Sequence, residues 1–218
     1  MNELVNKPEY CYQSEVAGHH HDYLLKPLME MISASTKRVG GKKCRILDIG
    51  CGNGSLSNFI AQQGHEVVGV EESESGVNIA QQSYPDCKFI AASIYDFPYD
   101  QLENSFDIII STEVIEHLPY PRELAKVAMR CLKNDGTLIL TTPYHGYLKN
   151  LALAVTGKLD SHFTALWDGG HIKFFSVKTL SALLLEQGFT DLQFKFAGSL
   201  PFLWKSMLVS TTLQNHSI

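Results

Sequence analysis

With 218 residues, 44% of them hydrophobic, the chain is long and apolar enough to bury the core of one α/β domain, and disorder is not expected. A net charge of −5 argues against a protein that binds duplex nucleic acid, which needs a basic face, and favours a small-molecule substrate. Five cysteines without a Cys-x-x-Cys pair, and no apolar run like that of a signal peptide, predict reduced thiols and a cytoplasmic location.

Strand-like and helix-like runs alternate along the chain, which is typical of a parallel sheet with crossover helices. Residues 10–36 are predicted to form one or two helices before the sheet begins. Apolar runs predict the strands, at 45–49, 66–70, 88–91, 106–111, 137–142, 190–197 and 205–211. Apolar stripes at helical spacing predict the helices that follow, at 55–63, 73–83, 121–132 and 176–187, with Ser73 and Ser176 as N-caps.

We expect a single domain over residues 1–218, divided into four parts. Residues 1–40 would form a helical cover, and residues 41–142 the cofactor-binding core. Residues 143–172 would form a substrate lid or insertion, because long connections in compact domains tend to be functional. Residues 173–218 would supply the C-terminal helix and strands.

A glycine-rich loop, Ile46-Leu-Asp-Ile-Gly-Cys-Gly-Asn-Gly54, ends the first predicted strand and opens a helix. A dinucleotide-binding fingerprint would have its third glycine at position 55, where this chain has Ser55. Asp48 would also repel a pyrophosphate, whereas S-adenosylmethionine has no phosphate and carries two positive groups. The loop therefore predicts S-adenosylmethionine as the cofactor, bound by Asp48, Gly50, Cys51, Gly52 and Gly54.

Further cofactor contacts are predicted where the next strands end. Glu71 follows the loop at the interval expected for a ribose ligand, with Glu72 as a competitor. After the third strand, Ser93 and Ile94 would contact the adenine, and Asp96 is an alternative polar contact. Thr112 completes the predicted set.

Four motifs occur in the order found in the class I S-adenosylmethionine-dependent methyltransferase family, which the chain resembles over about residues 40–200. They are the glycine loop, Glu71, Phe106-Asp-Ile-Ile-Ile110 and the run from Leu132 to Pro143. The resemblance implies a doubly wound, Rossmann-like sheet of seven strands, mostly parallel with a reversed last strand, and helices on both faces. Ser93 departs from it, since many relatives have aspartate there.

Within that family, Glu113-Val-Ile-Glu-His117 and His171-Ile-Lys-Phe-Phe-Ser176 most resemble the ubiquinone-biosynthesis O-methyltransferases. If residues 112–118 form a helical turn, Glu113, Glu116 and His117 face the same way. Carboxylate oxygens with one imidazole suit Mg²⁺ or Mn²⁺ better than zinc.

Three interpretations of this cluster remain open. His117, with Glu113 beside it, acts as the catalytic general base towards a hydroxyl. Alternatively, Glu113, Glu116 and His117 bind a metal that orients the acceptor, with His145 or His171 as a further ligand. In the third interpretation the cluster is structural.

The segment before the sheet contains three consecutive histidines and three tyrosines that lead to further hypotheses. Because consecutive residues of a helix point in different directions, we expect His19, His20 and His21 mostly to face solvent. One of the tyrosines, Tyr10, Tyr12 or Tyr23, is a candidate to close over the methionine end of the cofactor.

In the connection, an apolar stripe is formed by Tyr147, Leu148, Leu151, Ala152 and Val155. Either the stripe packs on the domain as ordinary core, or it belongs to a lid or an edge that touches a membrane holding a lipid-like acceptor. Lys149 and Lys158 are the two lysines available there for weak, peripheral membrane contact.

The predicted function is methyl transfer to a small-molecule or lipid-like acceptor, with a hydroxyl as the methylated group. The alternatives are a non-catalytic module that binds S-adenosylmethionine and an NAD-dependent reductase.

Overall fold

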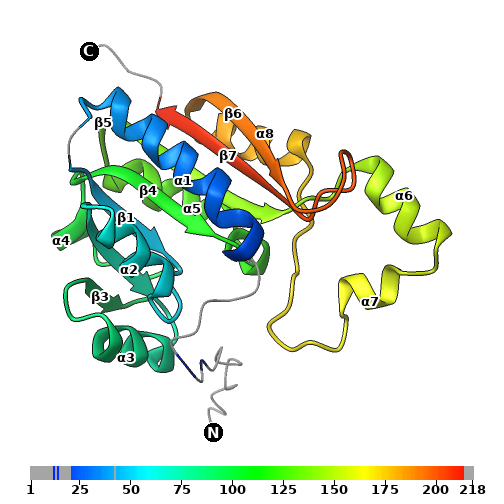
Figure 1. The fold of residues 1–218 in the computed structure, drawn as a ribbon, viewed down its shortest axis with the longest axis horizontal. Coiled ribbons are helices and arrows are strands. Elements are labelled where there is room, and N and C mark those ends of the chain that lie inside the picture. The colour runs from blue at the N-terminus through cyan, green and yellow to red at the C-terminus, as the bar shows by residue number, and fades with distance from the viewer. Residues whose placement is uncertain (1–11, 13, 15–20, 42, 214–218) are drawn as a thin grey trace, which may run out of the picture.

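The computed structural model describes residues 12, 14, 21–41 and 43–213 (Figure 1). Its sheet has seven strands in the order β3-β2-β1-β4-β5-β7-β6. The strands are β1 Arg45–Ile49, β2 Glu66–Glu71, β3 Lys88–Ala91, β4 Phe106–Thr112, β5 Leu132–Pro143, β6 Phe189–Ala197 and β7 Ser206–Leu213. β7 runs antiparallel to both β5 and β6, and the other paired strands are parallel. The predicted mostly parallel sheet with a reversed last strand is confirmed.

Helices cover both faces of the sheet (Figure 1). They are α1 His21–Arg38, α2 Ser55–Gln62, α3 Glu74–Ser83, α4 Tyr99–Leu102, α5 Arg122–Cys131, α6 Tyr147–Val155, α7 Leu159–Phe163, α8 Val177–Glu186 and a 3₁₀ turn, η1, Ile115–His117. Alternate residues of β4 divide between the two faces: Ile108 and Ile110 pack in a core with α1 and α2, while Ile109 packs in a core with α5 and α8. The doubly wound prediction therefore holds.

Local signals read from the sequence account for two helix starts. The Ser73 side chain accepts a hydrogen bond from the Gly76 amide, and Ser176 forms a reciprocal capping box with Thr179. β5 begins at Leu132, before its predicted start, because the strand pairs with β4 on both sides of an irregularity near Phe106. α4 was not predicted, and the helical turn considered over residues 112–118 is shorter in the structure, where η1 spans Ile115–His117.

The connection after β5 forms α6 and α7, which stand away from the sheet (Figure 1). The apolar stripe of α6 is turned outward, with Tyr147 80% exposed and Leu148, Leu151 and Val155 also exposed. The alternative in which this stripe is ordinary core is therefore wrong. Among the described residues, no helix is both long and apolar enough to cross a membrane.

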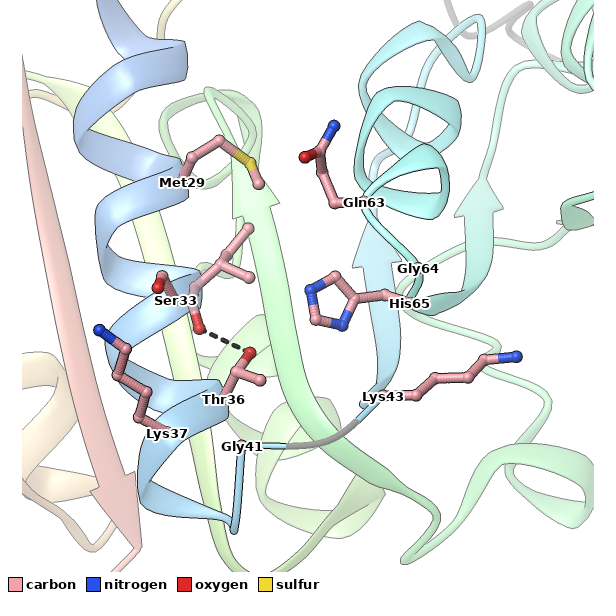
Figure 2. Close-up of a pocket in the computed structure, with 10 residues that line it drawn as sticks. Met29, Ser33, Thr36, Lys37, Gly41, Lys43, Gln63, Gly64 and His65 are labelled. Atoms are coloured by element: carbon pink, nitrogen blue, oxygen red, sulfur yellow. Dashed lines mark hydrogen bonds between the residues drawn. The ribbon is translucent and has the colours of Figure 1, made fainter.

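A cavity of about 430 Å³ lies between α1 and the end of α2, and Figure 2 shows His65 directed into it. Lys43, Gly64 and His65 line this cavity and precede β1 and β2, so it opens at the amino ends of these strands. The predicted cofactor residues lie at the opposite, carboxyl ends. This cavity is therefore separate from the candidate site.

Candidate active site

The glycine-rich loop joins β1 to α2 in a conformation that favours glycine. Gly50, Gly52 and Gly54 have φ angles of 76°, 56° and 78°. A Cβ atom on Gly54 would lie 2.7 Å from the Cβ of Ala80, and one on Gly50 would collide with Val114. These glycines therefore allow the loop to lie close against α3 and the segment between β4 and η1.

Tyr12 is the tyrosine that the structure places against this loop. Its hydroxyl would lie 2.7 Å from a Cβ on Gly52, and its backbone amide donates to the Ser75 hydroxyl at 3.2 Å. The Tyr23 hydroxyl instead lies 3.1 Å from the Ser206 hydroxyl. Tyr10 and His19–His20 lie outside the described residues, as does the side chain of His21.

Asp48 lies beneath the loop and is only 1% exposed. Its carboxylate accepts a hydrogen bond from the Ser57 hydroxyl at 2.6 Å. Burial raises the pKa of Asp48 to about 7, although the bond from Ser57 opposes this shift. The oxygen that accepts from Ser57 is directed at α2, and the contact between Asp48 and a positive cofactor group stays a prediction.

Glu71, at the end of β2, ties two backbone segments together. One carboxylate oxygen accepts from the Gly52 amide at 2.9 Å and the other from the Ser73 amide at 2.8 Å. Burial raises the pKa of Glu71, and these amide bonds oppose the shift. Each oxygen retains a lone pair, so the carboxylate can still accept ribose hydroxyls. Glu72 is exposed.

The remaining predicted cofactor residues lie at the same edge of the sheet. Ser93 and Ile94 follow β3 and are partly buried, and the Ser93 hydroxyl accepts from the Tyr95 amide at 3.3 Å. Thr112 ends β4, and its buried hydroxyl oxygen has no hydrogen-bond partner among the described residues. Because β1 to β4 are parallel, all these positions meet at their carboxyl ends, where α/β sheets bind ligands.

Glu113 departs from the predicted cluster. The helical turn η1 starts only at Ile115, and Glu113 has a φ of 54°. Its carboxylate accepts from the hydroxyls of Thr141 at 2.8 Å and Ser206 at 3.3 Å, so it faces β5 and β7. Burial raises its pKa to about 7. Glu113 therefore does not share the helical turn of Glu116 and His117, although Glu113 and Glu116 lie close enough to interact electrostatically.

Glu116, His117 and His171 instead come together, with one ligand atom from each within 4.8 Å of the others. One oxygen of the fully buried Glu116 accepts from Thr142 at 3.0 Å, while the other has no hydrogen-bond partner among the described residues and lies 4.0 Å from Nε2 of His171. An unpartnered buried carboxylate oxygen beside two imidazoles suits a divalent cation.

Of the two histidines that the sequence left open as a further ligand, His171 is the one that lies with Glu116 and His117. His145 lies in a different group of rings, with centroids 5.4 Å from His162 and 5.0 Å from Phe174. The structure therefore groups Glu116 and His117 with His171 and not with Glu113, and metal binding by these residues stays a prediction.

Sequence reasoning missed the side chains that bond to the two glutamates, namely Thr142 to Glu116, and Thr141 and Ser206 to Glu113. It also placed Lys149 on a membrane-facing surface, but Lys149 is buried. The spacing of α6 contained the signal: if the apolar stripe faces outward, Lys149 and Asn150 lie on the inward face.

The fold and the loop at its carboxyl edge are those of a methyltransferase. Residues 17–193 match the family model described as "Methyltransferase domain". The chain belongs to this family, whose cofactor is S-adenosylmethionine, and the reductase alternative is set aside.

Individual relatives agree with this assignment. Over 115 residues the chain is 32% identical to the ubiquinone biosynthesis O-methyltransferase of Idiomarina loihiensis, covering 51% of this chain and 46% of that protein. It is 31% identical over 169 residues to the protein of the same name from a Ruegeria species, covering 74% and 66%. The chain thus spans between about half and two thirds of the length of these relatives.

A solved structure resembles the fold as a whole. The magnesium protoporphyrin IX methyltransferase from Synechocystis, solved with bound SAH, matches with a TM-score of 0.63 at 19% identity, over 93% of this chain and 90% of that one. At this identity the likeness supports the fold.

Proposed function

We propose that this chain transfers the methyl group of S-adenosylmethionine to a hydroxyl oxygen of a small-molecule acceptor, assisted by Mg²⁺ or Mn²⁺ bound to Glu116, His117 and His171. The observation that supports this proposal most strongly is that one ligand atom from each of these three side chains lies within 4.8 Å of the others, next to the end of β4. The name of the relatives, O-methyltransferase, supports an oxygen acceptor.

Cofactor binding is assigned to the carboxyl ends of β1 to β4. The loop amides of Gly50 to Gly54 suit the cofactor carboxylate, and Glu71 suits the ribose hydroxyls. Ser93 and Ile94 are assigned to the adenine. Asp48 supports the loop from below through Ser57.

Methyl transfer is an in-line displacement in which the acceptor oxygen attacks the methyl carbon while the carbon–sulfur bond breaks. Alignment and exclusion of water are therefore the main tasks of the protein. Nδ1 of His117 lies 2.8 Å from the carbonyl oxygen of Gly169, so Nδ1 carries the ring proton and Nε2 keeps its lone pair. Nε2 is then the atom that binds the cation or accepts the hydroxyl proton. The cation, when bound, orients the acceptor oxygen and lowers its pKa.

A lipid-like acceptor at a membrane edge is a second part of the proposal. The outward stripe of α6 supports it, with Tyr147, Leu148, Leu151 and Val155 exposed. Because Lys149 is buried, Lys158 is the remaining lysine of the two expected to meet anionic headgroups, at about 1 kcal/mol. Such contact would be weak and would depend on the apolar face.

The test is a transfer assay with a radiolabelled methyl donor and a panel of catechols, phenols and small lipids. We expect label on a hydroxyl group, loss of transfer with EDTA, and recovery with Mg²⁺ or Mn²⁺. Label found only on carbon or nitrogen would contradict oxygen transfer. Full activity after exhaustive chelation would leave His117 as the base without a metal. Cofactor binding with no transfer to any acceptor would favour the non-catalytic alternative.

A further inference from the structure

Lys149, on the inward face of α6, is a buried lysine that the proposed methyl transfer does not use. It is 8% exposed, and lysines are rarely so buried without a partner. Its ammonium donates to the carbonyl oxygen of Lys205 at 3.4 Å, a long bond that leaves two N–H donors. No carboxylate of the described residues lies within ion-pairing distance, 4.0 Å, of this ammonium.

A second buried nitrogen, Nδ1 of His145, lies near Lys149. His145 is 7% exposed, and its Nδ1 has no well-formed hydrogen bond among the described residues, although the Asn150 side chain lies near it. Burial, followed by the charge of Lys149, lowers the pKa of His145 to about 4. The ring is therefore a neutral imidazole, which offers one N–H donor to a ligand.

The acid that interacts with Lys149 does not satisfy these donors. Glu113 interacts electrostatically with Lys149, but its two oxygens accept from the hydroxyls of Thr141 and Ser206. The ring centroids of Phe163 and Phe174 lie 5.9 and 5.0 Å from that of His145, so aromatic rings pack against this imidazole. The result is a buried pair of donors, one of them positive, that lacks an anion.

We propose that Lys149 and His145 form a subsite for a carboxylate group carried by the methyl acceptor. A carboxylate has the single negative charge that balances one ammonium, and charge-assisted hydrogen bonds to it are stronger than neutral ones. This inference rests on the proposed function, since it places the subsite in the acceptor pocket. Glu113 links the proposed carboxylate subsite to the proposed cation site, because it lies near Lys149 and precedes Glu116 and His117 in the same segment. The reacting hydroxyl would lie at the cation, and the carboxylate at α6.

Calorimetric titration tests the subsite without turnover. The probes are 3-hydroxybenzoate and 3-hydroxybenzamide, which differ in charge but share a ring and hydroxyl. Each is titrated into the whole chain saturated with S-adenosylhomocysteine, with EDTA present so that no metal binds the carboxylate. We expect the wild type to bind the benzoate at least about tenfold more tightly, the scale of a hydrogen bond to a charged group.

Two variants test whether Lys149 causes the preference for 3-hydroxybenzoate over 3-hydroxybenzamide. Lys149→Met keeps the length of the side chain without its charge, and Lys158→Met removes an exposed lysine of the same connection as a matched control. The preference should disappear in Lys149→Met and persist in Lys158→Met. Equal affinity of the wild type for both probes, no binding of either, or a preference that survives in folded Lys149→Met would overturn the subsite. Failure of methyl transfer with the preference intact would instead count against the proposed function alone.

Discussion

The cofactor side and the acceptor side of this site are built in different ways. On the cofactor side, short stretches of sequence carry the geometry: the glycines of one loop turn the chain, and Glu71 binds the amides of Gly52 and Ser73. On the acceptor side, each side chain is held by a distant segment, as when Thr142 binds Glu116 and Gly169 meets His117. A motif can describe the first side, whereas only the folded chain defines the second.

Replacing Gly52 should produce the largest effect on the cofactor side. Gly52→Val puts a β-branched residue at a φ of 56°, where a Cβ would also meet Tyr12, so we expect loss of measurable S-adenosylmethionine binding. Gly64→Val is the matched control, because Gly64 has a φ of 94° with open space around it and lies at the far end of α2. Calorimetry should show retained binding in the control. Equal loss in both variants would mean that backbone strain alone unfolds the domain.

On the acceptor side, His117→Ala should affect turnover but not cofactor binding. We expect kcat to fall by roughly 10²–10⁴-fold, since Nε2 is assigned to the cation or the proton. Steady-state kinetics with S-adenosylmethionine affinity measured in parallel check this. A drop of less than threefold would favour the structural role, in which His117 only bonds the carbonyl oxygen of Gly169.

Asp48 gives a prediction about pH on the cofactor side. The pKa of Asp48 in the folded protein, about 7, lies above the ordinary value of 3.8, so the buried charge destabilises the fold as pH rises between these values. Relative to Asp48→Asn, the wild type should therefore lose stability from about pH 4 to pH 7 and stay level above it, by a few kcal/mol in total. Urea unfolding of both proteins at pH 5 and pH 8 measures the difference. A constant difference would mean that Asp48 is ionised throughout.

The outward face of α6 should show the smallest effect on folding. Leu148→Ser with Leu151→Ser removes exposed apolar surface, so stability should change by less than about 1 kcal/mol. Sedimentation with anionic liposomes should be weak for the wild type and lost in the double variant. If the wild type does not sediment, the membrane part of the proposal is wrong.

Much of the fold was predictable because it depends on local patterns. The strands followed apolar runs, and Ser73 and Ser176 cap their helices as expected. The glycine loop was placed correctly, because glycine spacing reports backbone conformation directly. Asp48 was placed in the loop, but its burial against Ser57 comes from the packing of α2.

The acceptor side was less predictable because it depends on contacts distant in sequence. Glu113 bonds to Thr141 and Ser206 and is not in the group of Glu116, His117 and His171, and Ser206 lies on a strand near the other end of the chain. Lys149 was misplaced because spacing defines the two faces of a helix but not which one is covered. An apolar stripe is normally buried, and in α6 it is exposed.

The claim that Glu116, His117 and His171 together hold a cation is tested most directly by Mn²⁺ titration followed by electron paramagnetic resonance. The wild type should bind Mn²⁺, and His171→Ala should bind it at least about tenfold more weakly while keeping its S-adenosylmethionine affinity. His162→Ala, which changes a histidine outside the trio, should bind Mn²⁺ as the wild type does. Unchanged Mn²⁺ affinity in folded His171→Ala would contradict the assignment.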